Sequence, residues 1–179
     1  MTRLCSSQYA ALLRGINVNG INIKMADLKA AFESLGLKRV KTILASGNVL
    51  FETEDGAPTL THRIESALTG VFGYEAHVLL LDLATLGQIA RAYPFARSQD
   101  GWHDYVVFCF DDATRDELLS IQGKLNPELE RIQGGDSALY WRVRKGMTTD
   151  SAFGKLSGKA RFRATTTTRN LNTLEKLLV

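Results

Sequence analysis

Cysteine is nearly absent from this 179-residue sequence. Cys5 and Cys109 are the two that occur, and they lie far apart and outside any CxxC spacing. This excludes a disulfide framework, so we expect one reduced thiol in the amino-terminal tail and another packed in the core. The three histidines also lack the spacing of metal ligands, and we predict no metal or cofactor.

Long hydrophobic runs are absent as well. No apolar stretch approaches the roughly 20 residues that a membrane helix needs, and the opening "MTRLCSSQ" lacks the apolar core of a secretory signal. We therefore expect a cytoplasmic protein with no membrane partner. With 45% hydrophobic and 23% charged residues, the composition is that of a globular protein with one large domain or two small ones.

Acidic residues are scarce at both ends of the chain. Residues 1–50 carry seven Lys or Arg against two acids, and residues 151–179 carry six against one, so each end has a net charge of +5. Residues 51–150 carry nine against sixteen, a net charge of −7. If the two ends meet in space, they form a positive patch for an anionic partner. The alternative is that helix surfaces merely differ in sign.

Strand and helix signals alternate through the first half. Short apolar or alternating runs bounded by glycine and polar residues indicate strands, and apolar residues every three or four positions indicate helices. The order strand, helix, strand, strand, helix, strand is that of the ferredoxin-like β-α-β-β-α-β unit, which we assign to a first module, residues 1–82. The predicted strands are 9–15, 40–44, 48–53 and 77–82, and the predicted helices are 25–36 and 57–73.

The second half repeats this order after a connecting helix and loop, residues 83–102. We assign residues 103–179 to a second ferredoxin-like module with a carboxy-terminal helix, so the predicted fold class is α+β with two tandem modules. The predicted strands are 103–110, 128–133, 137–144 and 161–168, and the predicted helices are 112–123, 150–158 and 172–178.

Polar residues follow the first two strands of the first module. Crossovers of the strand–helix–strand kind are right-handed, and in this unit the first two strands run parallel, so their carboxyl ends share one edge of the sheet. The Arg14–Lys24 loop and the Ala45–Asn48 turn meet there, and we call this the loop edge. Backbone N–H groups of a glycine-rich loop that leads into a helix suit an anion, and basic side chains add charge. The candidate ligand-binding residues of the loop edge are Arg14, Asn17, Asn19, Lys24, Ser46 and Asn48.

The same loop also has a purely structural interpretation. Gly15 and Gly20 have the spacing that opens a phosphate-binding P-loop, but Ile21 and Asn22 stand where that motif needs Lys and Ser or Thr. Glycines supply positive φ angles, and asparagines bond to their own backbone in tight turns. Both interpretations stay open: a loop that binds a ligand, and a loop that only connects the strand to the helix.

A basic segment lies near the carboxyl end. Residues 151–174 contain five Lys or Arg and no acid. Arg169 and Asn170 meet no local structural need in the sequence, so they are further candidate ligand-binding residues. Asn172, three residues before Glu175, instead fits a capping box at the start of the last helix.

The two candidate segments lead to a joint prediction. We predict that the guanidinium groups of Arg14 and Arg169 lie on one face of the molecule, flanked by Ser46 or Asn48. The competing interpretation is a structural clamp, in which each buried arginine needs a carboxylate or several carbonyls to offset desolvation.

Two other clusters have weaker signals. Tyr140, Arg142 and Arg144 share one strand face by the two-residue period, which would suit a nucleic-acid surface. The run around Phe51, however, lacks the aromatic pattern of an RNA-recognition motif.

Three aspartates form the second of these clusters. Asp111, Asp112 and Asp136 lie at one edge of the second module, where carboxylate oxygens would suit a hard cation. The alternative is that Asp112 caps a helix and Asp136 closes a turn.

Three sequence blocks carry a family resemblance. "YAALLRGINVNGINIKMADLKAAFESLG", "TILASGNVLFET" and "TTTTRNLNTLEKLL" resemble the bacterial domain-of-unknown-function family 1697. The resemblance implies a small cytoplasmic α+β protein and no established activity. Where members carry "NWN", this chain has Asn170-Leu171-Asn172, which removes an indole that could stack on a base.

The sequence leaves three hypotheses on function. The first is a module that binds a phosphate-bearing ligand, either a nucleotide or a nucleic-acid backbone, at the loop edge. The second is a small-molecule enzyme of unknown reaction that uses the Arg14–Lys24 loop and the Ser46–Asn48 turn; no general base or catalytic residue is identifiable. The third is a protein-interaction domain with exposed strands and an acidic steering face.

Overall fold

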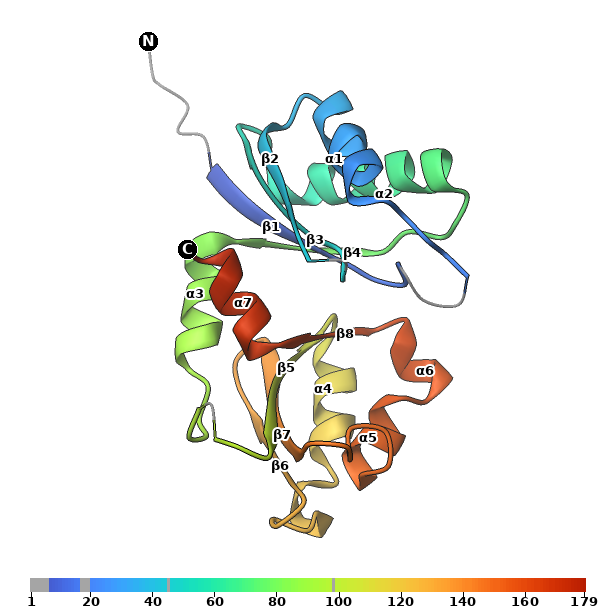
Figure 1. Cartoon of the computed structure of the whole chain (residues 1–179). Helices are drawn as coiled ribbons and strands as arrows, with labels where there is room; N and C mark the ends of the chain where they lie inside the picture. The colour runs from blue at the N-terminus through green and yellow to red at the C-terminus, as the bar shows by residue number, and fades with distance from the viewer. Residues whose placement is uncertain (1–6, 17–19, 45, 98) are drawn as a thin grey trace. The chain divides into compact units, whose positions relative to one another are not determined.

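The computed structural model describes residues 7–16, 20–44, 46–97 and 99–179 (Figure 1). The chain divides into two compact units. Unit 1 comprises the chain up to Leu86 together with Lys176–Val179, and unit 2 comprises Gly87–Glu175. Each unit contains one four-stranded antiparallel sheet with helices, which confirms the predicted α+β class.

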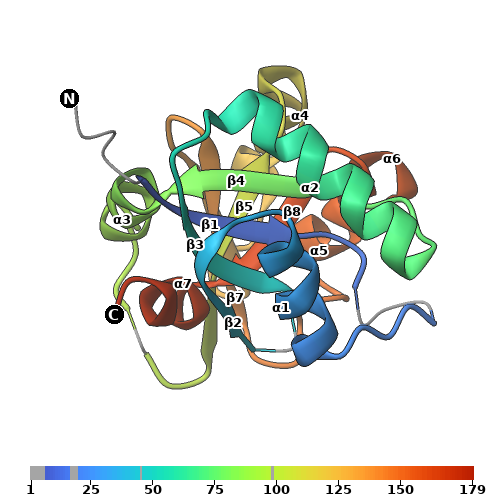
Figure 2. The ribbon, with the colours of Figure 1, turned by 90° about the horizontal axis from the view of Figure 1, so that it is seen from above.

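Unit 1 has the predicted order of strands and helices. Its sheet has the strand order β2-β3-β1-β4, and each neighbouring pair is antiparallel. The helices α1 and α2 lie over the same face of this sheet (Figures 1 and 2). The elements are β1 (Ser7–Leu13), α1 (Met25–Ser34), β2 (Lys38–Ile43), β3 (Asn48–Thr53), α2 (Ala57–Phe72) and β4 (Val78–Asp82), followed by the start of α3 (Leu83–Arg91).

Apolar side chains at helical spacing hold α1 and α2 on the sheet. In α2 they are Leu60, Ile64 and Leu68, all fully buried, and they recur every four residues along one side of the helix. The helix ends at Gly73, whose φ of 68° lets its N–H reach the carbonyl of Thr69. On the sheet, alternate residues of β1 and β3 meet these helices, so the other residues of the two strands face away from them.

Unit 2 contains the second sheet, with strand order β6-β7-β5-β8, again antiparallel throughout. Its core surrounds Trp141, which contacts the rings of Tyr105 and Phe153. The elements are the rest of α3, β5 (Trp102–Cys109), α4 (Asp112–Leu119), a 3-10 turn (Gln122–Lys124), β6 (Glu130–Gly134), β7 (Ala138–Arg144), α5 (Ala152–Ser157), α6 (Ala160–Arg163), β8 (Thr166–Asn170) and α7 (Leu171–Leu177), of which the last two residues belong to unit 1.

The strand predicted over residues 161–168 is partly wrong. Arg161–Arg163 belong to α6, whose Phe162 is buried, and β8 begins only at Thr166. The Thr166 hydroxyl donates a hydrogen bond to the Phe162 carbonyl, which fixes the step from helix to strand. Over so few residues, alternating basic and apolar side chains cannot distinguish a strand from one helical turn. Among the described helices, none is both long and apolar enough to cross a membrane.

Candidate functional site

The loop edge brings together the two segments that the sequence predicts to meet. Both β1 and β2 run antiparallel to β3, so they are parallel to each other. The N–H of Leu13, the last residue of β1, donates to the carbonyl of Gly47 in the β2–β3 turn at 2.8 Å. On the other side, the backbone N–H of Arg14 donates to the carbonyl of His77 at 3.0 Å. His77 precedes β4 and is a neighbour of the edge that sequence reasoning missed.

Arg14 leaves β1 with a half-buried side chain. Burial lowers the pKa of its guanidinium group, because desolvation disfavours the charged form. Within the described residues, no hydrogen bond or ion pair reaches this guanidinium group; only the backbone N–H of Arg14 is bonded. A partly desolvated cation without a counter-charge is costly, and an anionic ligand would offset that cost.

The turn beside Arg14 is held by Asn48. Asn48 is fully buried, and its side-chain nitrogen donates to the Ile43 carbonyl at 3.0 Å and to the Ser46 hydroxyl at 2.8 Å. Asn48 therefore fixes the turn from within, whereas Ser46 is exposed at the edge.

Lys24 lies at the start of α1, where its backbone is extended and its side chain is exposed. No contact of the Lys24 ammonium group with another described side chain or carbonyl occurs. Asn17 and Asn19, the remaining candidates of the loop edge, lie outside the described residues.

Arg169 and Asn170 belong to unit 2 and have local partners that the sequence did not suggest. Arg169 is buried, and its Nη1 donates to the Thr167 hydroxyl at 2.9 Å and to the Thr168 carbonyl at 3.0 Å. Burial lowers the pKa of Arg169 to about 10, so the group stays charged at neutral pH. The Asn170 side chain accepts a hydrogen bond from the Asn172 N–H at 2.9 Å, which is the helix-start contact that the sequence assigned to Asn172 itself.

The joint prediction for Arg14 and Arg169 stays a prediction, because the two residues belong to different units.

The aromatic and basic residues of β7 contact other parts of unit 2. The guanidinium groups of Arg142 and Arg144 lie 4.7 and 4.2 Å from the ring centre of Trp102. Arg142 is buried and lies 3.7 Å from the Asp104 carboxylate, and the buried Tyr140 donates its hydroxyl to a backbone carbonyl. These contacts give Tyr140 and Arg142 structural roles within unit 2.

The aspartates of unit 2 likewise have protein partners. Asp111, rather than Asp112, caps α4 by accepting from the Thr114 N–H and hydroxyl. Arg115 pairs with the Asp112 carboxylate at 3.2 Å and donates to the Asp136 carbonyl. Among the residues that the structure describes, no group of three or more His, Cys, Asp or Glu side chains is arranged to hold a metal.

Cys109 is a free thiol in β5, and burial raises its pKa to about 11. At pH 8 about one thiol in a thousand is therefore ionised, and only the thiolate attacks a disulfide. In a Cys5→Ser variant, which leaves Cys109 as the one cysteine of the sequence, we expect slow reaction with Ellman's reagent at pH 8 and roughly tenfold faster reaction for each pH unit up to pH 10. A fast reaction that does not change with pH would contradict this assignment.

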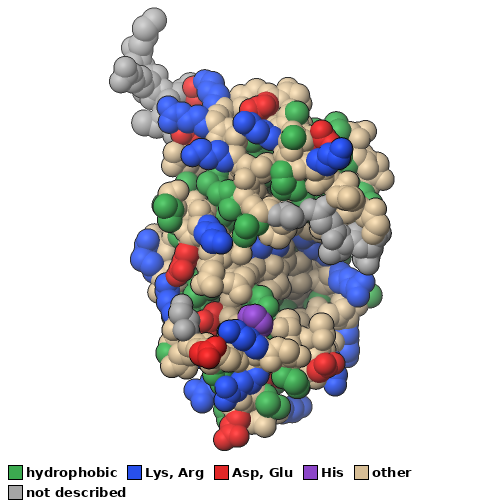
Figure 3. All heavy atoms as spheres, in the orientation of Figure 1, with side chains coloured by type: hydrophobic (Ala, Val, Ile, Leu, Met, Phe, Trp, Pro, Cys, Tyr) green, Lys and Arg blue, Asp and Glu red, His purple; other side chains and the backbone are tan. Residues whose placement is uncertain are grey.

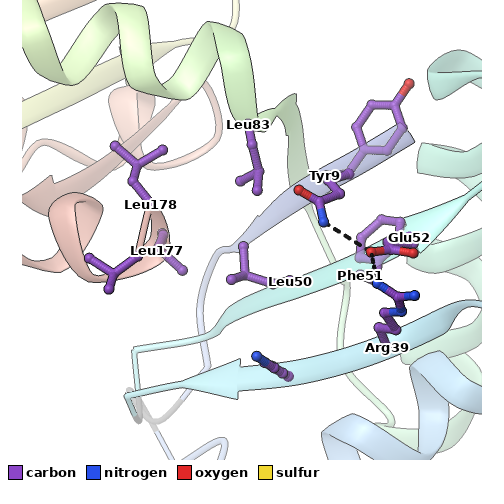
Figure 4. Close-up of a pocket in the computed structure, with 11 residues that line it drawn as sticks. Tyr9, Arg39, Leu50, Phe51, Glu52, Leu83, Leu177 and Leu178 are labelled. Carbon is purple, nitrogen blue, oxygen red and sulfur yellow. Dashed lines mark hydrogen bonds and ion pairs between the residues drawn. The ribbon is translucent and has the colours of Figure 1, made fainter. Parts of the chain in front are cut away.

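A hollow of unit 1 lies toward the opposite end of β1 from the loop edge. It is a cavity of about 320 Å³ on the sheet, closed in part by the last residues of the chain (Figure 4). In the space-filling view, hydrophobic side chains are exposed beside basic and acidic ones around the chain's end (Figure 3). Sequence reasoning missed this cavity because it joins residues 8–52 to residues 177–179, and no local pattern predicts that contact.

Comparison with known proteins places the chain in a family. The family described as "Protein of unknown function (DUF1697)" matches residues 6–140. The chain belongs to this family. The matched segment contains the whole loop edge but neither Arg169 nor Asn170. It confirms the family resemblance and covers the first two sequence blocks, whereas the third lies beyond residue 140.

Two individual proteins are similar to this DUF1697 chain. A formamidopyrimidine-DNA glycosylase of Agrobacterium fabrum is 32% identical over 108 residues, which cover 57% of this chain and 34% of that protein. The chain thus spans about a third of the length of this relative. The structure of a conserved bacterial protein from Streptococcus pneumoniae has a TM-score of 0.78 at 24% identity, covers 97% of both chains, and shares the fold.

Proposed function

We propose that the protein binds a phosphate-bearing ligand, a nucleotide or a nucleic-acid backbone, at the loop edge of unit 1. The observation that carries the proposal is the Arg14 side chain, which is half-buried and has no anionic or carbonyl partner in the described residues. A guanidinium group presents a planar fork of donors that matches two oxygens of a phosphate. The ligand would supply the counter-charge that the protein does not.

The surroundings of Arg14 support an anion. The Ser46 hydroxyl is exposed on the neighbouring turn. Gly15 has a φ angle of 72° and nothing within 4 Å of an added Cβ, so its backbone is open to a ligand. The exposed Lys24 at the start of α1 is a second basic residue of the loop edge and adds to its positive charge.

The name of one relative supports a nucleic acid among the phosphate-bearing ligands. The similar protein of Agrobacterium fabrum has "DNA glycosylase" in its name, and the match covers 34% of its length. We include a DNA backbone among the ligands to test, and we transfer no catalytic activity from that protein.

The test compares Arg14→Gln with Lys29→Gln. Lys29 is a half-exposed lysine of α1 that pairs with Glu33 and lies outside the loop edge, so it is the matched control for the loss of one charge. At low ionic strength we expect the wild type to bind a fluorescent oligonucleotide or a nucleotide from a panel, with affinity that falls steeply as salt is added. Arg14→Gln should weaken binding about tenfold, the usual effect of one charge-assisted hydrogen bond. Lys29→Gln should leave it nearly unchanged.

Thermal stability separates a binding role from a structural one. Arg14→Gln removes a desolvated charge with no described partner, so its melting temperature should match the wild type. A large drop in melting temperature would make Arg14 a structural residue and overturn the proposal, as would the absence of binding by the wild type across the panel. Arg169→Ala should lower the melting temperature, since it removes two buried hydrogen bonds. Arg169 joins the proposed site only if its loss weakens binding at unchanged stability.

A further inference from the structure

The cavity on the sheet of unit 1 has the size and walls of a small-molecule site. Its volume of about 320 Å³ is at the lower end of the range of about 300–1,000 Å³ that is usual for ligand pockets. All of its lining residues belong to unit 1, to which the last four residues of the chain return. We call it the sheet pocket; it does not include the loop edge.

One side of the sheet pocket is apolar. Leu83 from the start of α3 and Leu177 and Leu178 from the chain's end gather around Leu50 of β3 (Figure 4). Leucines from three separated segments border a partly open space that no side chain of the described chain fills. Such a wall favours the hydrocarbon part of a ligand.

The other side of the pocket is polar, and two of its three charged side chains are paired with each other. Glu52, with 14% of its side chain exposed, accepts from Gln8 Nε2 at 2.9 Å and pairs with Arg39 Nη1 at 3.2 Å (Figure 4). Lys41 lies opposite Leu50 in the strand register, beside the apolar wall. In the described part of the chain the Lys41 ammonium group has no hydrogen bond or ion pair, so it is the available charge of this pocket.

The strand β2 is irregular where these cations lie. The register with β3 shifts between Lys38 and Lys41, so β2 has one extra residue there, and Arg39 has a φ of 51°. Bulges of this kind re-aim side chains, and a positive φ is uncommon for a residue other than glycine. Arg39 and Lys41 both line the pocket while Val40, between them, is buried in the core, as expected for alternate residues of a strand.

We propose that the sheet pocket binds a small amphipathic monocarboxylate, with its hydrocarbon part against the leucines and its carboxylate on Lys41. Among the side chains that line the pocket, Arg39 and Lys41 against Glu52 leave a charge of +1, which matches a singly charged head group. A phosphate dianion would exceed that charge and approach the Glu52 carboxylate. The site is independent of the loop edge, because it uses other residues and another ligand class.

The test uses octanoate and the fluorescent probe 8-anilinonaphthalene-1-sulfonate, which is also an apolar monoanion. We expect saturable binding of the probe to the wild type and its displacement by octanoate but not by inorganic phosphate. Lys41→Glu should weaken octanoate binding at least about tenfold, because it turns the one available attraction into repulsion. Lys29→Glu, the same reversal on an exposed lysine of α1, should not change it.

A second variant tests the apolar wall without a change of charge. Leu178→Ser alters an exposed side chain, so the fold should persist, and octanoate should bind several-fold more weakly. No saturable binding by the wild type, or equal binding by Lys41→Glu and Lys29→Glu, would overturn the proposal. Phosphate-ligand binding should be unchanged in Leu178→Ser, so failure here is distinguishable from failure at the loop edge.

Discussion

Replacing Glu130 with alanine is expected to destabilise unit 2 by about 3–5 kcal/mol, because its buried carboxylate satisfies two buried donors. Glu130 lies in β6 and is 2% exposed. Its Oε2 accepts from the Trp141 indole N–H at 3.1 Å, and its Oε1 accepts from the Phe153 backbone N–H at 3.1 Å. One carboxylate thus joins a strand of the sheet to the first turn of α5.

The size of the effect follows from the two buried N–H groups that lose their acceptor. Without the carboxylate, the indole N–H and the Phe153 N–H stay buried without an acceptor, at a cost of about 1–3 kcal/mol each. Trp141 and Phe153 also contact each other, with ring centres 5.0 Å apart, so a shift of either one disturbs the core of unit 2. Glu130→Gln should fall between wild type and alanine, since an amide offers one acceptor oxygen and a donor that opposes the second N–H.

Urea unfolding of Glu130→Ala, Glu130→Gln and Glu128→Ala measures this prediction. Glu128 lies two residues earlier with an exposed side chain, so its removal should change stability by less than about 0.5 kcal/mol. If Glu130→Ala is no less stable than Glu128→Ala, the bridging role of Glu130 is wrong.

The order of the elements was predictable because helix and strand signals differ in this chain. The recurrence of Leu60, Ile64 and Leu68 every four residues indicates a helix, and the short apolar run of β1 indicates a buried strand. The meeting of the Arg14 loop with the Gly47 turn followed from the parallel direction of the first two strands, whose carboxyl ends share one edge of the sheet. These parts of the fold and of the candidate site depend on regular geometry, which sequence patterns encode.

The features that the sequence did not predict, the cap of α7 and the sheet pocket, do not depend on such regular geometry. Asn170, not Asn172, makes the contact at the start of α7. Both asparagines could cap the helix, and the residue at which the helix begins decides which of them does so. The sheet pocket depends on Leu177 and Leu178 lying beside β3. A contact between segments so far apart in the chain cannot be predicted from the local sequence pattern.

Replacing Gly47 with alanine is expected to destabilise unit 1 by about 2–4 kcal/mol and to weaken ligand binding at the loop edge. Gly47 has a φ of 76°, which alone costs an alanine about 1–2 kcal/mol. An added Cβ would also lie 2.6 Å from Ile16 Cδ1 and 3.0 Å from Leu13 Cβ. The Ile16 side chain can turn aside, but the Leu13 Cβ is attached to the β1 backbone and cannot.

The control is Gly36→Ala, which isolates the contact from the backbone strain. Gly36 has a φ of 80° and nothing within 4 Å of an added Cβ, so it should lose about 1–2 kcal/mol and no binding affinity. In Gly47→Ala, relief of the clash moves the turn whose carbonyl accepts from Leu13, and this displaces Ser46 relative to Arg14. Urea unfolding and nucleotide titration of the two variants measure both effects. Equal stability losses would mean that the turn yields without strain, and unchanged binding in Gly47→Ala would show that the geometry of this turn does not serve the ligand.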